Sequence, residues 1–385
     1  LNHDELAFAV NGYVAGDVPD YQMSALLMAI YLRGMTDEET AMLTDVMAHS
    51  GDMVDLSAIA GIKADKHSTG GVGDKTTLVI APIVAACGVK IGISVIGQSG
   101  KIAVADKKMY ALRDVTATVG CIPLIASSIM SKKLAAGSDA ILLDVTMGDG
   151  AFMKDLDGAL ELARQMVAIG TAHGRKVAAL ITDMDKPLGY NIGNSLEVAE
   201  SMAVLQGKGP ADLTEVCLQL ASNMLVLAGK GDMPTCRKLA ESVIADGTAF
   251  EKCCRMFAAQ GGDISVLKDT DKFRKAKYSY ELTAQADGYI YKNDVEKIGN
   301  ASVLLGAGRI KKEDSIDFAA GITMHKKLGD YVKAGESICT FYADDESLFA
   351  AAEEMYRGGL IIRAEKPTVP PLIYARVTAD GVERF

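Results

Sequence analysis

The sequence lacks an excess of basic residues, and this sets the first limit on function. Its 40 Lys and Arg residues are outnumbered by 50 Asp and Glu residues, so the formal net charge is −10. A protein with this charge repels the phosphate backbone of nucleic acids and the surface of anionic membranes. We therefore expect no nucleic-acid or membrane partner. A site for an anionic substrate would have to be a local pocket of positive charge.

The seven cysteines lack the spacing of a zinc site or a disulfide framework. Their number is odd, none forms a C-x-x-C pair, and Cys253 and Cys254 are adjacent. We expect reduced thiols, as in intracellular proteins. No apolar run reaches membrane-spanning length, and no basic segment precedes a short apolar one near the start. These absences predict a cytoplasmic protein, and because the chain begins at Leu1, we expect the start of translation to be missing.

What is present predicts more than one domain, because 385 residues with 49% hydrophobic composition can form a large core. Residues 21–32 are apolar on one face, and Thr36 with Glu39 forms a capping box before a second amphipathic run. From residue 62, short aliphatic runs alternate with helical ones, which favours an α/β sheet covered by helices. The expected strands are 92–97, 140–145 and 176–182, and the expected helices are 153–170, 195–206 and 212–228.

A helical segment over 115–136 predicts that the chain leaves the α/β region and returns to the helical one. After residue 276 the runs are short and alternating, as in a lipoyl-like hammerhead. Lys326 and Lys327 lie where such a domain carries a modified lysine, but a solvated turn is the favoured interpretation. The fold class is thus α/β, with a substrate cleft between domains. The expected parts are a small all-helical domain (1–49 and 103–136), a large mixed α/β domain (50–102 and 137–274) and a β-rich C-terminal part packed on the latter (275–385).

The segment 65–74 brings together a cation, an imidazole, two hydroxyls and three glycines. Lys66 and Ser68 supply charge and a donor, and His67 can transfer a proton near neutral pH. Glycines let backbone N–H groups approach a ligand, and a helix that begins just after them, ahead of the apolar run 78–87, adds its positive dipole end. The pattern matches neither the Walker A nor the Rossmann motif. We favour a bound oxyanion, such as phosphate, beside a general acid over a turn whose polar residues only cap a helix.

A second group of polar residues follows. Ser128 and Lys132 are four residues apart, so they share one face of a helix. They could bind the polar edge of a planar ligand, with Arg113 adding forked donors. An amphipathic helix with an exposed lysine, and an ion pair between Arg113 and Asp114, explains the pattern equally well. The glycine cluster at 144–153 indicates mainly a tight turn between a strand and a helix.

Long stretches of the chain resemble the pyrimidine nucleoside phosphorylases, a family that includes thymidine phosphorylase. The resemblance covers nearly the whole chain, and its motifs are long and specific. The matching stretches are KHSTGGVGD (66–74), GQSG (97–100), ADKKMYALRDVTATV (105–119), IPLIASSIMSKKLAAGSDAILLDV (122–145), GAFMK (150–154), PLGYNIGNSLEV (187–198), AKYSYELTAQADGYI (276–290) and LGAGRIKKEDSID (305–317).

The resemblance implies a reversible phosphorolysis. A pyrimidine nucleoside such as uridine, thymidine or deoxyuridine would react with orthophosphate to give the free base and (deoxy)ribose 1-phosphate. The family works as a homodimer through its helical domains, and domain closure brings the two substrates together. No cofactor is required. Some members hold a structural monovalent cation near the glycine-rich loop, which suggests a K⁺ site near Gly73.

Position by position, the resemblance also implies roles for individual residues. Three match residues that bind phosphate, three match residues that hold the base, and a histidine matches one placed near the pyrimidine 2-carbonyl. The expected catalytic residues are His67, Arg113 and Lys132, the phosphate-binding residues are Lys66, Ser68 and Thr77, and the base-binding residues are Arg113, Ser128 and Lys132.

One departure from the family pattern concerns the phosphate site. After Ile91 the family continues into a glycine-rich segment that supplies a Ser and a Thr to phosphate, whereas here Gly92 follows directly. We expect the natural polypeptide to contain this segment between Lys90 and Gly92, because phosphate needs further donors. A genuine deletion would favour a degenerate, non-catalytic homologue. A smaller departure is Thr146, where the family often has Lys.

Two further enzyme functions stay open. The first is a thymidine phosphorylase restricted to deoxyribosides, although 110–119 and 122–133 resemble the broad-specificity bacterial members more closely. The second is a phosphoribosyltransferase of related fold, such as the anthranilate enzyme, which would use Mg²⁺ and a pyrophosphorylated ribose. The β-rich C-terminal part argues against the second.

Overall fold

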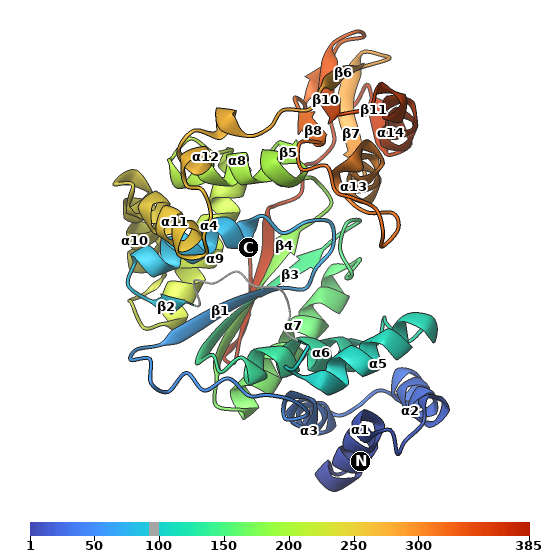
Figure 1. Ribbon diagram of the computed structural model, residues 1–385, viewed down its shortest axis with the longest axis vertical. Helices are drawn as coiled ribbons and strands as arrows, with labels where there is room; N and C mark the ends of the chain where they lie inside the picture. Colours follow the sequence, from blue (N-terminus) through green and yellow to red (C-terminus); the bar gives the residue numbers. More distant parts are fainter. Residues whose placement is uncertain (92–99) are drawn as a thin grey trace.

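The computed structural model describes residues 1–91 and 100–385. A helical domain forms one end of the molecule, an α/β domain the middle and a β-rich part the other end (Figure 1). The expected strand over 92–97 lies outside the described residues, as does the downstream side of the Lys90–Gly92 junction. Within the described residues, no helix is both long and apolar enough to span a bilayer. All seven cysteines are free thiols, as expected, and six of them are buried.

The helical domain is built from two separate stretches of chain. Thr36 caps the third helix, and its reciprocal bonds with Glu39 form the predicted capping box. Apolar side chains of all five helices, such as Leu6, Met23 and Leu124, pack into one core. The chain thus returns to pack against its first three helices. The helices are α1 (His3–Ala15), α2 (Asp20–Arg33), α3 (Asp37–Ala48), α5 (Val104–Val115) and α6 (Ile122–Ala135).

The α/β domain contains a six-stranded sheet in the order β13-β12-β4-β3-β1-β2. Strands β2, β1, β3 and β4 are parallel, and β12 and β13 are antiparallel additions at one edge. β3 is buried along its whole length, because helices cover both faces of a parallel sheet. The strands are β1 (Lys63–Ser68), β2 (Lys90–Ile91), β3 (Ala140–Met147), β4 (Lys176–Asp183), β12 (Ile373–Thr378) and β13 (Gly381–Arg384).

Two cores cover the two faces of this sheet. On one face Leu142 and Leu180 pack with apolar residues of helices that include α4 and α9. On the other face Leu143 and Ile181 pack with α6 and α7, so α6 joins the helical domain to the sheet. The helices of the α/β domain are α4 (Thr76–Ala86), α7 (Leu156–Ala172), α8 (Asn194–Leu205), α9 (Ala211–Leu227), α10 (Met233–Ala245), α11 (Thr248–Ala259), α12 (Ser265–Lys268) and η1 (Thr270–Lys272).

The C-terminal part consists of a four-stranded sheet, β5-β8-β10-β6, and a three-stranded sheet, β11-β7-β9. Their inner faces share a core with two helices, in which Phe341 and Tyr356 are fully buried. The elements are β5 (Asn191–Ile192), β6 (Tyr278–Thr283), β7 (Gly288–Asn293), α13 (Val295–Ser302), η2 (Val303–Ala307), β8 (Gly321–Met324), β9 (Tyr331–Val332), β10 (Ser337–Ala343), η3 (Glu346–Leu348), α14 (Phe349–Arg357) and β11 (Leu360–Arg363).

Two expectations about the C-terminal part were wrong. Residues 275–385 do not form one part, because β12 and β13 return to the α/β sheet, where β12 pairs with β4 and β13 pairs with β12. Nor do Lys326 and Lys327 lie in a solvated turn. Lys326 pairs with Glu336, and Lys327 pairs with Asp212 at the start of α9 and lies over the ring of Tyr190. The contacts of Lys327 anchor the C-terminal part to the α/β domain.

Candidate active site

Lys66 is the centre of the phosphate side of the expected site. It lies near the end of β1, and its side chain is only 3% exposed. Its Nζ lies 3.0 Å from a carboxylate oxygen of Asp74 and 3.1 Å from one of Asp144. The same nitrogen donates to the hydroxyl of Thr76 at 2.9 Å. Parallel pairing of β1 with β3 places Asp144 beside this strand end. A buried lysine is thereby held between two carboxylates.

This pairing keeps Lys66 charged. Burial lowers the pKa of Lys66, but the nearby charges of Asp144 and Asp74 outweigh it, so the pKa is raised above the ordinary value. Burial has the opposite effect on Asp74, and Lys66 again outweighs it, so the pKa of that carboxyl is lowered. Both groups are ionised at neutral pH. A phosphate at this point would therefore meet a permanent cation.

The loop before α4 lies next to this cation and contains three glycines. Its glycines at positions 70, 71 and 73 all have positive φ angles. At Gly71, an added Cβ would lie 2.3 Å from the carbonyl oxygen of Gly150, so only glycine fits. The loop leads into the N-terminus of α4, where unpaired N–H groups and the helix dipole favour an anion. The expected helix start after the glycines is confirmed.

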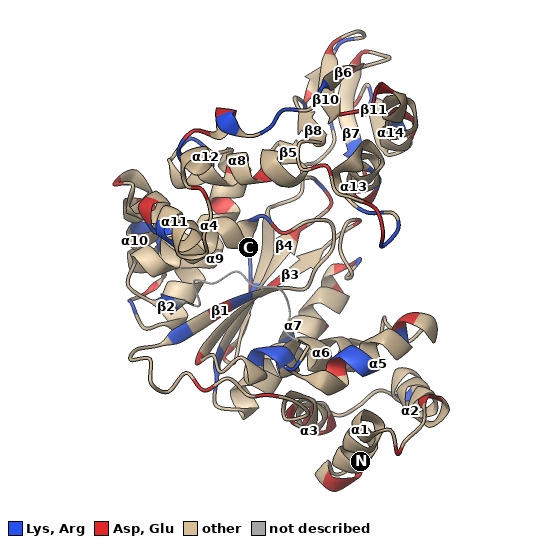
Figure 2. Ribbon diagram, viewed as in Figure 1, with Lys and Arg blue, Asp and Glu red and all other residues tan. Residues whose placement is uncertain are grey.

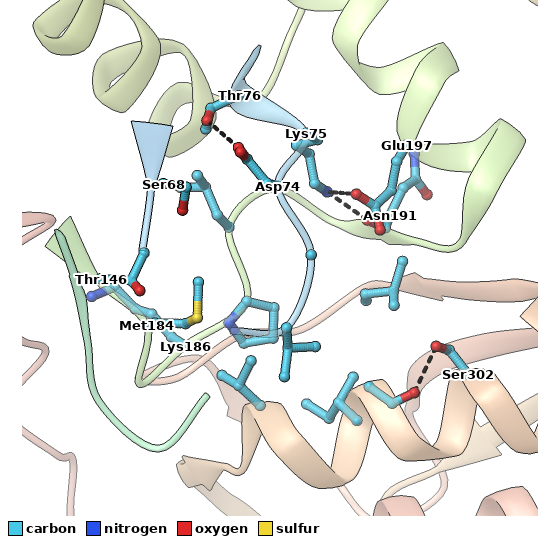
Figure 3. Close-up of a pocket in the computed structure, with 18 of the residues that line it drawn as sticks. Ser68, Asp74, Lys75, Thr76, Thr146, Met184, Lys186, Asn191, Glu197 and Ser302 are labelled. Atoms are coloured by element: carbon cyan, nitrogen blue, oxygen red, sulfur yellow. Dashed lines mark hydrogen bonds and ion pairs between the residues drawn. The ribbon is translucent and has the colours of Figure 1, made fainter. Parts of the chain in front are cut away.

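A cavity of about 550 Å³ adjoins this loop, a volume typical of small-molecule sites. It lies between the loop, the ends of β3 and β4, α8 and α13. Ser68 lines it, whereas Thr77 does not; Thr77 instead donates to Asp74. Figure 3 labels ten lining residues: Ser68, Asp74, Lys75, Thr76, Thr146, Met184, Lys186, Asn191, Glu197 and Ser302.

The expected base-binding residues lie on α5 and α6, away from this cavity. Ser128 and Lys132 do share a helix face, because the Nζ of Lys132 donates to the hydroxyl of Ser128 at 3.1 Å. That nitrogen also pairs with Asp106 of α5 at 2.5 Å. Figure 2 shows basic residues on β1 and along α5 and α6, the elements that carry the two halves of the site.

Arg113 does not form the ion pair with Asp114 that one interpretation of its sequence offered, and its role in binding a planar ligand stays a prediction. It is 2% exposed, and its guanidinium donates to backbone carbonyls and not to Asp114. Nη2 donates to Val119 at 2.8 Å and Nη1 to Leu124 at 3.0 Å. Burial lowers the pKa of Arg113. The side chain thus fastens the end of α5 to the start of α6, which is a structural role in this state.

His67 connects the two sides of the site. It follows Lys66 on β1 and therefore points to the opposite face of the sheet, toward α6. Burial lowers the pKa of His67 well below its ordinary value of 6.5, and the charges of Lys133 and Lys132 lower it further. The imidazole is neutral at pH 7. It can donate a hydrogen bond, but it does not carry the additional proton of a cationic general acid.

Near Gly73, where a K⁺ site is expected, oxygen atoms of the protein are bonded to the side chain of Lys75. The ammonium of Lys75 donates to the carbonyl oxygen of Asn191 at 2.6 Å and to Glu200 at 2.8 Å. Across the described ranges 1–91 and 100–385, no group of three or more His, Cys, Asp or Glu side chains is arranged to hold a metal ion. Because the Lys75 ammonium already bonds the carbonyl of Asn191 and the carboxylate of Glu200, these residues do not fit a bound K⁺.

Sequence reasoning missed the acidic partners of the expected cations. Asp74 and Asp144 hold Lys66, and Asp106 holds Lys132. All three lie inside stretches that were singled out, but only the fold brings Asp144 beside β1 and Asp106 beside α6. Thr146 also lines the cavity, and it donates to the carbonyl oxygen of Gly70 at 2.6 Å. The strand end that begins the glycine cluster at 144–153 thus lines the candidate cavity.

Comparisons with known families agree with the resemblance. Residues 1–51 match the helical bundle domain of a glycosyl transferase family, and 90–250 match its a/b domain. Residues 289–362 match the pyrimidine nucleoside phosphorylase C-terminal domain. The matched regions follow the same order as the three parts of the fold.

Curated relatives match the chain over nearly its whole length. The pyrimidine-nucleoside phosphorylase of Geobacillus stearothermophilus is 48% identical over 419 aligned positions, which cover 98% of this chain and 96% of the relative. The enzyme of the same name from Bacillus subtilis (strain 168) is 46% identical with the same coverage. Because 419 positions exceed the 385 residues of the chain, the relatives contain residues that this chain lacks.

A solved structure shows a similar fold. The anthranilate phosphoribosyltransferase of Thermus thermophilus aligns with a TM-score of 0.53 and 16% sequence identity. The alignment covers 96% of that chain but 70% of this one, so much of this chain has no counterpart there. At this identity the likeness shows the fold alone.

Proposed function

The chain belongs to the pyrimidine-nucleoside phosphorylase family, and we propose that it catalyses the reversible phosphorolysis of uridine, thymidine and deoxyuridine. The products would be the free base and (deoxy)ribose 1-phosphate. The observation that carries this proposal is the buried, permanently charged Lys66 beside a glycine-rich loop and a helix N-terminus. This is the arrangement that an oxyanion requires.

At the phosphate end, Lys66, Ser68 and Thr77 would bind orthophosphate. Lys66 supplies the charge, the hydroxyls supply donors, and the first turn of α4 supplies N–H groups. Lys66 and Thr77 both contact Asp74, whose side chain is 36% exposed. Phosphate would compete with this carboxylate, whereas Asp144, at 5% exposed, would remain as the fixed counter-charge.

At the base end, Lys132 and Ser128 would hold the pyrimidine. Negative charge develops on the ring as the glycosidic bond breaks, and a preorganised cation stabilises it. His67 would donate a hydrogen bond to the ring as a neutral imidazole. Arg113 would reach the base only by giving up some of its bonds to backbone carbonyls. Its expected role as a base-binding and catalytic residue therefore requires a rearrangement at the start of α6.

The two sets of residues lie on different domains, so we propose that the domains close on the substrates. Lys66 and Ser68 belong to the α/β domain, and Ser128 and Lys132 belong to α6. Closure would hold phosphate and nucleoside in reacting geometry and remove much of the entropic cost of a two-substrate reaction. His67 lies within electrostatic reach of Lys132, which supports this arrangement.

We also propose that the helical domain forms a homodimer contact. Large apolar side chains are exposed on its surface: Phe8 on α1 is 77% exposed, and Tyr21 and Leu32 on α2 are 73% and 70% exposed. Exposed apolar side chains gathered on one small domain are typical of an interaction surface. Light scattering would show a dimer in solution, and Leu32→Asp should shift it toward monomer.

The test is release of free base from each nucleoside with and without orthophosphate. Cleavage of uridine and thymidine only in the presence of phosphate supports the proposal. Cleavage of thymidine and deoxyuridine but not of uridine would support the alternative of a thymidine phosphorylase restricted to deoxyribosides. Binding of phosphate without turnover would support a degenerate homologue, the outcome expected if the segment absent after Ile91 is essential. Release of base in phosphate-free buffer would indicate a hydrolase and reject the proposal.

A further inference from the structure

Lys75 is a second buried lysine in the loop that precedes α4. Its side chain is 9% exposed, and it points toward Asn191 and Glu197 (Figure 3). Its Nζ lies 2.6 Å from the carbonyl oxygen of Asn191, 2.8 Å from Glu200 and 3.8 Å from Glu197. The proposed reaction uses none of these groups. A cation is thus enclosed by one carbonyl and two carboxylate oxygens.

The two carboxylates are positioned by other bonds. Glu200 is 5% exposed, and its second oxygen accepts from the backbone N–H groups of Tyr190 at 2.7 Å and Asn191 at 3.2 Å. Glu197 accepts from the backbone N–H of Gly193 at 3.1 Å. Burial raises the pKa of Glu197, and Lys75 opposes this effect. Without Lys75, both acids would lose their cation beside a site that must attract an anion.

The ammonium also fixes the position of the phosphate-side loop. Lys75 directly precedes α4, and its partners lie more than a hundred residues later on β5 and α8. Gly73 approaches the same partners, because a Cβ added there would lie 4.0 Å from Glu197. Loss of this contact would release the end of the loop that carries Asp74 and Thr76.

We propose that Lys75 is a positioning residue that acts as a built-in monovalent cation. Its ammonium occupies an oxygen-lined position that would otherwise take K⁺ or NH₄⁺, and it holds the loop in the geometry that binds phosphate. The oxygens are the donors that hard cations prefer, and K⁺ is close to an ammonium group in size. The protein itself therefore needs no added K⁺. The part of this inference that concerns phosphate affinity rests on the proposed function, whereas cation binding does not.

The first experiment measures thermal unfolding and does not depend on turnover. Lys75→Ser leaves a cavity, and serine is favoured at a helix start. Lys75→Met removes the charge but fills the space. In KCl, Lys75→Ser should unfold about 2–4 °C higher than in tetramethylammonium chloride of equal ionic strength, since a ligand of the native state stabilises it. The unchanged protein and Lys75→Met should show no such difference.

The second experiment measures the KM for phosphate during phosphorolysis. In tetramethylammonium buffer, Lys75→Ser should raise this KM by at least about tenfold, because one partner of a buried charged hydrogen bond is lost. Saturating K⁺ or NH₄⁺ should bring the KM for phosphate most of the way back to that of the unchanged protein. In each salt, kcat should change much less than KM. Lys75→Met should stay impaired in every salt. Lys327→Ala, which removes another buried ammonium near α9, is the matched control and should not respond to K⁺.

Several results would overturn the inference. They are a K⁺ requirement in the unchanged protein, a Lys75→Ser variant with normal phosphate KM in tetramethylammonium buffer, and equal responses of Lys75→Ser and Lys75→Met to K⁺. Failure of both variants to fold in any salt would also overturn it, because the role of Lys75 would then be structural alone. If the unchanged protein shows no phosphorolysis, the proposed function fails, and the unfolding experiment still decides the cation site.

Discussion

The phosphate side and the base side of the site hold their cations in different ways. On the phosphate side, Lys66 lies on a strand between two carboxylates that keep it charged. On the base side, Lys132 has one carboxylate partner in the described residues, and Arg113 donates to neutral backbone carbonyls and lies over the ring of Tyr110. We propose that the phosphate side binds a permanent anion that competes with Asp74 for Lys66. We propose that the base side stabilises charge that appears only as the bond breaks.

This difference also affects how much each basic side chain contributes to substrate binding and how much to the stability of the fold. Lys66 belongs to the sheet and is enclosed by residues of β3 and the loop before α4, so its loss leaves acids unpaired in the interior. Arg113 joins two helices of a smaller domain, so its loss leaves carbonyl groups without donors. Substitutions on the two sides should therefore change activity and stability in different proportions.

Lys66→Met should have the largest effect. It removes the cation for phosphate and leaves Asp144 and Asp74 uncompensated, so we expect activity to fall by at least about 10³-fold. Unfolding free energy should fall by about 3–5 kcal/mol. Steady-state kinetics and urea unfolding measure both quantities. Lys63→Met on the same strand, whose partner Asp139 is 32% exposed, is the control and should cost about 1 kcal/mol or less. Equal effects of the two substitutions would remove Lys66 from the phosphate site.

Lys132→Ala should lower kcat/KM by about 10²–10³-fold, since it removes a donor to developing charge. The cost in unfolding free energy should be smaller than for Lys66→Met, at about 1–3 kcal/mol from the unpaired Asp106. Lys133→Ala, the next residue on α6, removes a partly exposed pair with Asp65 and should change kcat/KM little. A larger loss in Lys133→Ala than in Lys132→Ala would show that the wrong lysine has been assigned to the base.

Arg113→Ala should reduce the stability of the fold as well as activity, because the guanidinium bonds backbone carbonyls of the protein. Backbone carbonyls of Thr118, Val119 and Leu124 would lose their donor, and we expect a loss of about 2–4 kcal/mol in unfolding free energy. Arg113→Lys keeps the charge but cannot replace the forked bonds, so it should restore only part of the stability. If Arg113→Ala keeps full stability and loses activity a hundredfold, the side chain turns to the base and the structural role is wrong.

His67 should produce the smallest effect, visible in the pH dependence of stability. Its folded-state pKa lies below the unfolded value of about 6.5, so the unfolded chain binds more protons between the two values. Stability contributed by the neutral imidazole is complete above about pH 6.5 and falls as the pH is lowered toward the folded pKa. Urea unfolding from pH 7.5 to 5 should show this decline, and His67→Gln should flatten it. An identical slope in His67→Gln would contradict the lowered pKa.

Much of the fold could be predicted because its signals are local. The aliphatic runs at 140–145 and 176–182 indicated β3 and β4, and Thr36 with Glu39 indicated the start of α3. The final strands could not be placed, because β12 pairs with β4 across nearly two hundred residues of intervening sequence, and β13 joins the sheet only through β12. Short strands carry no signal of which sheet they will join.

The sequence indicated which residue types form the candidate site. It did not indicate which carboxylates pair with the basic side chains of that site. The loop at 65–74 and the i,i+4 pair of Ser128 and Lys132 are local patterns. The contacts of Asp144 with Lys66 and of Asp106 with Lys132 depend on the sheet order and on helix packing. Arg113 is buried and donates to three backbone carbonyls, and local sequence contains neither fact. Its role in binding the base stays a prediction.

The central claim is that phosphate held by the Lys66 loop attacks a pyrimidine nucleoside. The most direct measurement is the phosphorus-31 NMR spectrum of orthophosphate incubated with the protein and uridine or thymidine. The account predicts that the orthophosphate signal declines as a pentose 1-phosphate signal grows, in step with release of free base, and that Lys66→Met abolishes both changes. Free base that accumulates while the orthophosphate signal stays constant would contradict it.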